Sequence, residues 1–230
     1  MVYHIPIHGT IDMGLPHYLQ RVIDQAESEK AAAIIFDIDT FGGRVDAATQ
    51  MKDIILDSKV VTVAFINKRA ISAGALISLS CDSIFMTAGA SIGAATAVDL
   101  KGEKASEKII SYMREEMAST AEANNRSRDV ASSMVDEELS ISFIVSSQGD
   151  TLTRKDVEGF SEGKLITLST RLAILLGIAD KQLNNIDDVL DHMNLKDAKK
   201  VEITESWSEM LVRFLTNPTV APLFMSLGML

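Results

Sequence analysis

The chain reads Asp-Thr-Phe-Gly-Gly at residues 39–43 and Ile-Ser-Ala-Gly at residues 71–74. Each segment follows an apolar run that is typical of a buried strand, residues 32–38 in the first case and residues 60–66 in the second. Ser72 also opens an apolar stretch that predicts a buried helix. Both segments therefore lie where a strand passes into a helix, which is where parallel α/β sheets bind ligands and present reactive groups.

The residue types in these two segments suit acyl transfer. Gly42 and Gly43 allow the backbone to approach a substrate closely and to present its N–H groups. Ser72 stands at the start of a predicted helix, beside unpaired backbone donors and the positive end of the helix dipole. Because serine is also a common N-cap, the residue alone favours a simple capping role. A nucleophile with an oxyanion cradle could nevertheless be built from the two segments together.

Size, charge and cysteine content limit the class of protein. The 230 residues suit one α/β domain with an appendage. The formal net charge of -10 disfavours electrostatic binding to nucleic acid or to anionic lipid. The single cysteine, Cys81, rules out an internal disulfide framework. Asp37 and Asp39 flank a strand end without a histidine near them in the sequence, so we expect no metal and no other cofactor.

Strands and helices alternate in the first half of the chain. The expected strands are residues 2–7, 32–38, 60–66 and 83–86, with residues 8–11 as a turn and helices after Pro16, from Val45 to Leu56 and over 73–79. This order predicts an α/β fold with a mostly parallel sheet and surrounding helices. The second half is predicted to hold helices at 108–123, 130–138 and 186–193, with a weaker strand at 139–145.

The end of the chain is apolar. Residues 220–230 contain no charged side chain, but the run is shorter than the roughly 20 residues that span a bilayer. We expect residues 1–215 to form the folded domain. Residues 216–230 are then an apolar tail, which could pack on the domain or on a neighbour but which we expect to lead toward a transmembrane region.

The motifs, taken in order, resemble a known family. They are His8-Gly9-Thr10-Ile11, then Asp39-Thr40 with Gly42-Gly43, then Ser72-Ala73-Gly74, then Ala90-Ser91-Ile92-Gly93-Ala94. This set is similar to the NfeD-type membrane-bound serine peptidases of the Clp protease/crotonase fold group, which are related to signal peptide peptidase A. The resemblance covers nearly the whole chain. It implies a Clp/crotonase-like fold, a serine–lysine dyad and cleavage of hydrophobic, membrane-proximal segments in stomatin-type partners. It also implies a catalytic domain outside the cytoplasm and associated with a membrane.

The resemblance assigns roles to individual residues. Ser72 is the expected nucleophile, and the N–H groups of Gly43 and Ala73 are the expected oxyanion donors. Gly42 and Gly74 are expected to support the substrate groove. The family usually has proline where this chain has Phe41, so we expect a less rigid glycine loop.

A lysine is the expected general base. His4, His8 and His17 lie upstream of both segments, and His192 lies in an acidic helix that reads as solvated surface. Alignment with the family pattern places the dyad lysine at Lys108, although helical periodicity turns this residue away from the apolar face that includes Ile109 and Ile110. The assignment therefore requires Lys108 to lie in the first helical turn, where the helix dipole lowers the pKa of an ammonium group. Lys104 is the second candidate.

Two other functions share these features. A crotonase-like enzyme would use the same amide cradle to stabilise the enolate of an acyl-CoA, and an inactive scaffold would only bind a membrane partner. We expect the chain to form at least a homodimer, because its apolar tail needs burial against something.

Overall fold

The computed structural model describes residues 1–98, 103–139, 143–146, 149–153, 164–216 and 220. Its centre is a mostly parallel sheet with the strand order β10-β1-β2-β3-β4-β9, and β5 pairs with both β3 and β8. The strands are β1 (Val2–Ile11), β2 (Ala33–Gly43), β3 (Thr62–Ile71), β4 (Ser83–Met86), β5 (Ser91–Gly93), β8 (Thr167–Ser169), β9 (Lys181–Gln182) and β10 (Lys200–Glu202). The β5–β8 pair is antiparallel. The predicted α/β class is confirmed.

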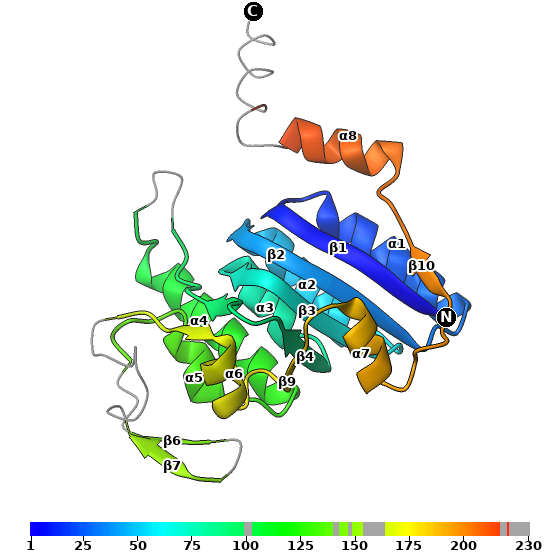
Figure 1. Cartoon of the computed structure of the whole chain (residues 1–230). Helices are drawn as coiled ribbons and strands as arrows, with labels where there is room; N and C mark the ends of the chain where they lie inside the picture. The colour runs from blue at the N-terminus through cyan, green and yellow to red at the C-terminus, as the bar shows by residue number, and fades with distance from the viewer. Residues whose placement is uncertain (99–102, 140–142, 147–148, 154–163, 217–219, 221–230) are drawn as a thin grey trace, which may run out of the picture.

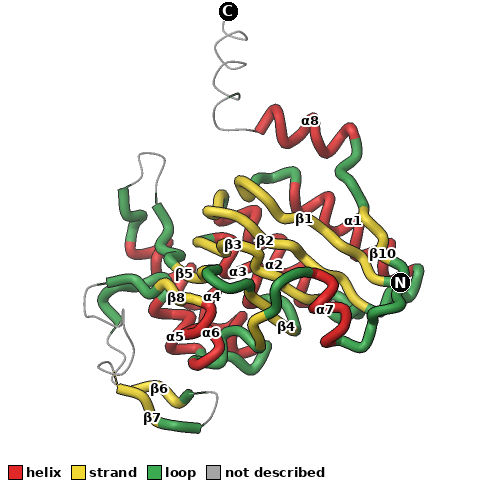
Figure 2. The backbone as a smooth tube through the Cα atoms, in the orientation of Figure 1, coloured by secondary structure: helices red, strands yellow, loops and turns green. Residues whose placement is uncertain are grey.

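Helices cover the two faces of this sheet unequally (Figures 1 and 2). One face is packed by α1 (Leu15–Ser28), α2 (Val45–Leu56) and α3 (Ala73–Leu79). The other face carries the short α7 (Ile186–His192), which packs on the amino-terminal halves of the strands. This arrangement follows from the sequence, because α1 has an apolar stripe at helical spacing and the central strands are apolar on both faces.

Three more helices lie at the side of the sheet that carries β4, β5 and β8 (Figure 1). They are α4 (Glu107–Ala123), α5 (Arg128–Ser133) and α6 (Thr170–Leu175). The end of α4 is fixed to the core, because the Asn124 side chain donates to the carbonyl of Leu79 at 2.8 Å. The buried Arg126 guanidinium donates to the carbonyls of Cys81 and Ile178. These bonds fix the carboxyl-terminal end of α4 beside the end of α3.

Two elements lie at the periphery of this body (Figure 1). One is the antiparallel hairpin of β6 (Phe143–Val145) and β7 (Thr151–Thr153). The other is α8 (Trp207–Thr216), which the sequence did not predict. Among the described residues, no helix has both the length and the apolarity needed to cross a bilayer. The predicted tail falls almost entirely on 217–219 and 221–230, outside the described residues.

Three local predictions were wrong. Residues 8–11 continue β1 with an irregularity between His8 and Thr10, and they do not form a separate turn. Helix α5 ends at Ser133 and does not reach residue 138. It ends there because the next carbonyls, of Met134 and Val135, accept hydrogen bonds from residues 95 and 96. Ile109, expected on the buried face of α4, is exposed.

Candidate active site

Ser72 joins β3 to α3 in a sharp, strained turn. Its backbone angles, φ 55° and ψ -117°, lie in a region that residues other than glycine rarely adopt. Its N–H donates to the carbonyl of Gly93 in β5 at 3.0 Å. Its side chain forms no capping hydrogen bond with α3, so the capping interpretation is wrong. A strained serine between a strand and a helix is the arrangement that presents the nucleophile in α/β-hydrolases.

Gly42 lies directly against Ser72. A Cβ added at Gly42, where φ is 105°, would lie 2.6 Å from Cβ of Ser72 and 3.1 Å from its Oγ. A Cβ added at Gly74 would lie 2.5 Å from Cγ2 of Thr40. The glycines therefore let the end of β2 and the start of α3 approach to backbone contact. The structure brings together the two segments that the sequence singled out.

Thr40 fixes the conformation of the glycine loop, and sequence reasoning did not identify this role. Its side chain is buried, accepts the N–H of Gly42 at 2.9 Å and donates to the carbonyl of Gly9 in β1. It also packs against Gly74 in α3. One hydroxyl thus links the ends of two strands. Its only sequence signal is a threonine two residues before a glycine, which is typical of a side-chain-stabilised turn.

The expected oxyanion donors, Gly43 and Ala73, lie at the end of β2 and at the start of α3. The chain directly after Gly43 remains bonded to β1, because the Arg44 N–H donates to the carbonyl of Ile11 at 2.9 Å. Ala73 is the first residue of α3, and no oxygen of the described residues accepts its N–H. Both donors lie in residues adjacent to the contact between Gly42 and Ser72.

Lys108 lies in the first turn of α4, as the assignment requires. It is the second residue of the helix, and its side chain is exposed. Within the described part of the chain it forms no ion pair. Lys104 differs, because its ammonium group lies 3.0 Å from the carboxylate of Glu137. This hydrogen bond raises the pKa of Lys104, which makes it less suitable as a base.

An apolar groove of about 870 Å³ lies between the start of α2 and the start of α4. Its apolar lining comes from both sides and includes Val45, Ala97, Val98, Ile109 and Tyr112. Arg44, the neighbour of Gly43, is one of the lining residues, and so are Ser106 and Ile109. The groove is thus lined by sequence neighbours of both Gly43 and Lys108.

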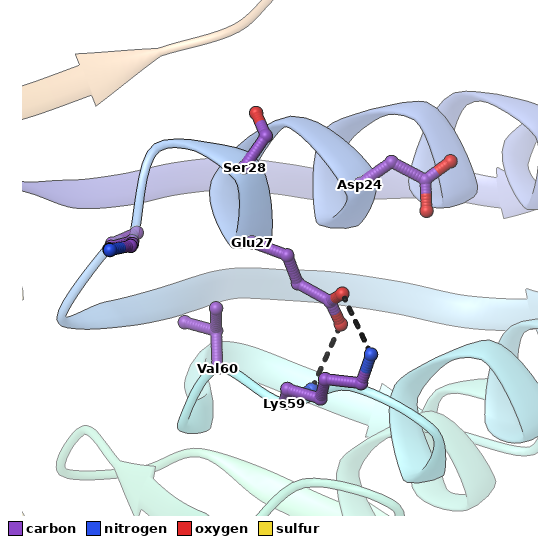
Figure 3. A pocket seen from close by; sticks show the side chains of 7 residues that line it. Asp24, Glu27, Ser28, Lys59 and Val60 are labelled. Atoms are coloured by element: carbon purple, nitrogen blue, oxygen red, sulfur yellow. Dashed lines mark hydrogen bonds and ion pairs between the residues drawn. The ribbon is translucent and has the colours of Figure 1, made fainter.

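A second hollow, of about 630 Å³, lies at the opposite end of the strands (Figure 3). It is bordered by Asp24, Glu27 and Lys59, and Glu27 is engaged by both the backbone N–H and the ammonium group of Lys59. Because this hollow lies near the amino-terminal ends of the strands, far along the sheet from Ser72, we assign it no catalytic role.

A histidine–carboxylate cluster lies on the open face of the sheet. It corrects the expectation that no histidine accompanies Asp37. Asp37 has histidines beside it, with its Oδ2 3.7 Å from Nε2 of His4 and 3.4 Å from Nε2 of His8. His4 and His8 are distant from Asp37 in the sequence, and the contact arises because β1 and β2 pair in parallel. The described residues hold no group of ligands suited to a metal ion.

The Asp37 carboxylate raises the pKa of His4. Burial alone would raise the pKa of Asp37, but the facing imidazoles outweigh it and lower this pKa.

We expect this cluster to make stability depend on pH. Protonated His4 stabilises the fold fully below its unfolded pKa of about 6.5, and this contribution disappears as pH rises through the raised folded pKa. His4→Gln should therefore lower the free energy of unfolding by roughly 1 kcal/mol or less near pH 5, and by less above pH 8. Urea unfolding at the two pH values measures this. The exposed His17→Gln is the control, and an equal pH effect in both variants would contradict the assignment.

Arg69 supports the glycine loop where the family has proline. Its guanidinium lies 4.5 Å from the centre of the Phe41 ring and its Nε lies 3.4 Å from the carboxylate of Asp39. Lys68 also approaches Asp39, at 3.6 Å. These contacts join the carboxyl-terminal ends of β2 and β3. They restrain a loop that the sequence alone suggested to be less rigid.

Solved structures share this fold. The 1510-N membrane-bound stomatin-specific protease of Pyrococcus horikoshii, in a serine-to-alanine form, has a TM-score of 0.72 at 23% identity and covers 90% of this chain and 98% of that chain. A lysine-to-alanine form in complex with a substrate peptide has a TM-score of 0.73 at 22% identity, over 94% of this chain and 98% of that one. ClpP1 from Listeria monocytogenes has a TM-score of 0.56 at 22% identity, over 79% and 91%. The predicted Clp-like fold is confirmed.

Sequence comparison identifies the family. The chain is 34% identical over 229 residues to the membrane protein NfeD1b of Bacillus subtilis, covering 100% of this chain and 49% of that protein. It is 25% identical over 236 residues to the membrane-bound protease PH1510 of Pyrococcus horikoshii, covering 99% and 51%. The chain thus spans about half the length of these relatives. The sequence model of the NfeD1b N-terminal domain matches residues 1–203, and the chain belongs to this family.

Proposed function

We propose that this chain is the catalytic domain of a serine endopeptidase in which Ser72 is the nucleophile. The observation that carries the proposal is the conformation of Ser72, a strained serine that does not cap its helix and that packs against Gly42. Backbone strain of this kind costs roughly 1–3 kcal/mol and is concentrated at functional sites. The relatives named as proteases support the same reaction class.

In the proposed mechanism Lys108 is the general base. Its neutral amine removes the proton from Ser72 Oγ as the oxygen attacks the scissile carbonyl carbon. The tetrahedral intermediate collapses, and the departing amine takes the proton back from the lysine. Water, deprotonated by the same lysine, then hydrolyses the acyl-enzyme and regenerates Ser72.

The N–H groups of Gly43 and Ala73 would hold the negative oxygen of the intermediate. One donor comes from the end of β2 and the other from the start of α3, so the direction of each is fixed by an element of the core. Thr40 would act as a positioning residue, because its hydrogen bond with Gly42 sets the peptide group next to Gly43. Preorganised donors of this type contribute about 10²–10³ in rate each.

Exposure of Lys108 suggests that the substrate completes the site. Lys108 lies next to Ile109, which lines the apolar groove. A peptide that occupies the groove would exclude water from the first turn of α4, and exclusion of water favours the neutral amine that the reaction needs. This role agrees with the solved relatives, which include serine-to-alanine and lysine-to-alanine forms.

The groove favours an extended polypeptide with apolar side chains. Its lining is mostly apolar, with Val45, Val98 and Ile109 on facing sides. The net charge of -10 disfavours acidic sequences. We propose hydrophobic, membrane-proximal segments of stomatin-type proteins as substrates, because the solved relative is named a stomatin-specific protease. Homo-oligomerisation and membrane association through the region after residue 215 belong to the same proposal.

A serine-directed phosphonate tests the proposed function. The reagent should form a stable covalent adduct, and mass spectrometry of a digest should locate it on the peptide that contains Ser72. The Ser72→Ala protein, with every other serine unchanged, should remain unmodified. A wild-type protein that resists the phosphonate but is retained on immobilised CoA would instead support the crotonase-like enzyme, and resistance without CoA binding would support the scaffold.

A further inference from the structure

Helix α8 is held to the body of the protein by charged side chains. Glu209 forms a paired ion contact with Arg21 of α1, at 2.9 and 2.7 Å. Arg213 lies one turn later, and its Nε is 2.8 Å from Oδ2 of the buried Asp12. The hydrogen bond from Arg21 lowers the pKa of Glu209 to about 2, so the contact stays charged at any working pH. The inward face of α8 is therefore its polar face.

Gly14 leaves the space that the Arg213 side chain occupies. A Cβ added at Gly14 would lie 2.4 Å from Cγ of Arg213, so the arginine stem rests directly on the backbone between β1 and α1. The N–H of Gly14 donates to Asp12 at 2.9 Å, which orients the carboxylate that Arg213 contacts. The contacts of Arg213 with Gly14 and Asp12 therefore fix the orientation of α8 on the domain.

The outward face of α8 is apolar. Trp207, Leu211 and Leu215 are respectively 74%, 39% and 43% exposed. At 100° per residue these side chains share an arc of roughly 80° that lies on the side opposite Glu209. A helix on the surface of a globular protein normally has the reverse orientation, with its apolar stripe on the core. The fold therefore presents an apolar face to whatever surrounds it.

A second copy of the chain is a poor occupant for this face. A ten-residue helix is about 15 Å long and about 10 Å wide, so one side offers roughly 150 Å². A stable protein–protein interface buries about 800 Å² on each partner. A bilayer surface has no such requirement, because each apolar side chain gains by leaving water independently.

The composition of α8 and of the sequence after it favours a bilayer of neutral lipids. Tryptophan is enriched where protein meets the headgroup region. The sequence of residues 217–230, which follows α8, contains no charged residue, so the chain continues with apolar character. The net charge of -10 disfavours electrostatic attraction to anionic lipid. The binding energy must therefore come from apolar burial.

We propose that α8 lies along the bilayer surface, with Trp207, Leu211 and Leu215 at the boundary between headgroups and acyl chains. This inference rests on the membrane setting of the proposed function. Because Arg213 contacts Asp12 directly after β1, α8 would hold the carboxyl-terminal ends of the strands near the membrane. The groove beside Gly43 would then receive segments that emerge from the bilayer.

The single tryptophan of the chain, Trp207, is a built-in reporter for this test. Vesicles of neutral phosphatidylcholine should shift its emission to shorter wavelength, and vesicles with brominated acyl chains should quench most of its intensity. The Leu211→Ser, Leu215→Ser double variant should lose the shift and the quenching. A matched Leu56→Ser, Val61→Ser variant, which alters exposed apolar residues far from α8, should keep both.

Three outcomes would overturn the proposal. Vesicles that carry the protein in flotation while Trp207 emission stays that of a hydrated indole would assign binding to residues 217–230. An emission shift that depends on protein concentration without lipid would assign the face to a second copy. Unchanged emission with no flotation would exclude the membrane. Cleavage of a dissolved apolar peptide, measured on the same double variant, should be unchanged, so failure of the membrane contact and failure of the peptidase are told apart.

Discussion

Replacing Ser72 with alanine should reduce peptide cleavage by roughly 10³-fold or more, because the acyl-enzyme can no longer form. The fold should tolerate the change, since the side chain caps no helix and alanine occupies the same backbone conformation at similar cost. Cleavage of an apolar reporter peptide and urea unfolding measure the two effects on the same protein.

Ser80 provides the matched control for this substitution. It lies at the other end of α3, is buried, and donates to the carbonyl of Ile77 at 2.7 Å. Ser80→Ala should lower the free energy of unfolding by about 1 kcal/mol and leave cleavage unchanged. Near wild-type cleavage by Ser72→Ala would refute the nucleophile assignment, whatever the behaviour of Ser80→Ala.

Lys108→Ala should abolish cleavage to a similar extent and should remove an ionisation from its pH profile. A lysine base acts only when neutral, so the wild-type rate should rise with pH on the alkaline side of neutrality. Lys108→Arg should also fail, because it keeps the charge but cannot give up a proton. The measurement is kcat/KM from about pH 6 to about pH 10, because lysine bases in enzymes have a pKa lowered to about 7–8.

Lys104→Ala is the control for this pair of variants. Its contact with Glu137 keeps Lys104 charged, so its loss should leave the pH profile in place. If Lys104→Ala were inactive and Lys108→Ala active, the role of base would move to Lys104. If both variants kept activity and profile, neither Lys104 nor Lys108 would be the base.

The central elements could be predicted because local signals and tertiary contacts agree there. Helices α2 and α3 begin and end at the residues that the sequence predicted, and the start of α4 differs by one residue. In each case an apolar pattern with the right period coincides with burial. The contact of Gly42 with Ser72 follows from the parallel pairing of β2 and β3, which the strand–helix alternation also predicts.

Other features depend on contacts between residues distant in the sequence. The cluster around Asp37 requires the register between β1 and β2, and the role of Arg69 requires the place of Phe41 in space. The sequence did not predict α8, because its apolar side chains face away from the core and do not form a buried apolar stripe. The roles of Ser72 and Lys108, and the domain boundary at residue 215, remain predictions.

The conformation of Ser72 places catalytic need and folding stability in opposition at one position. Glycine adopts a φ of 55° at the lowest cost in free energy, so replacing Ser72 with glycine would relieve backbone strain. The serine hydroxyl is thus kept at a position where glycine would be more stable. A lineage that no longer needed cleavage would gain stability by mutating this codon toward glycine. Glycine at this position in a family member would therefore be the evolutionary mark of a chain that has become a binding protein.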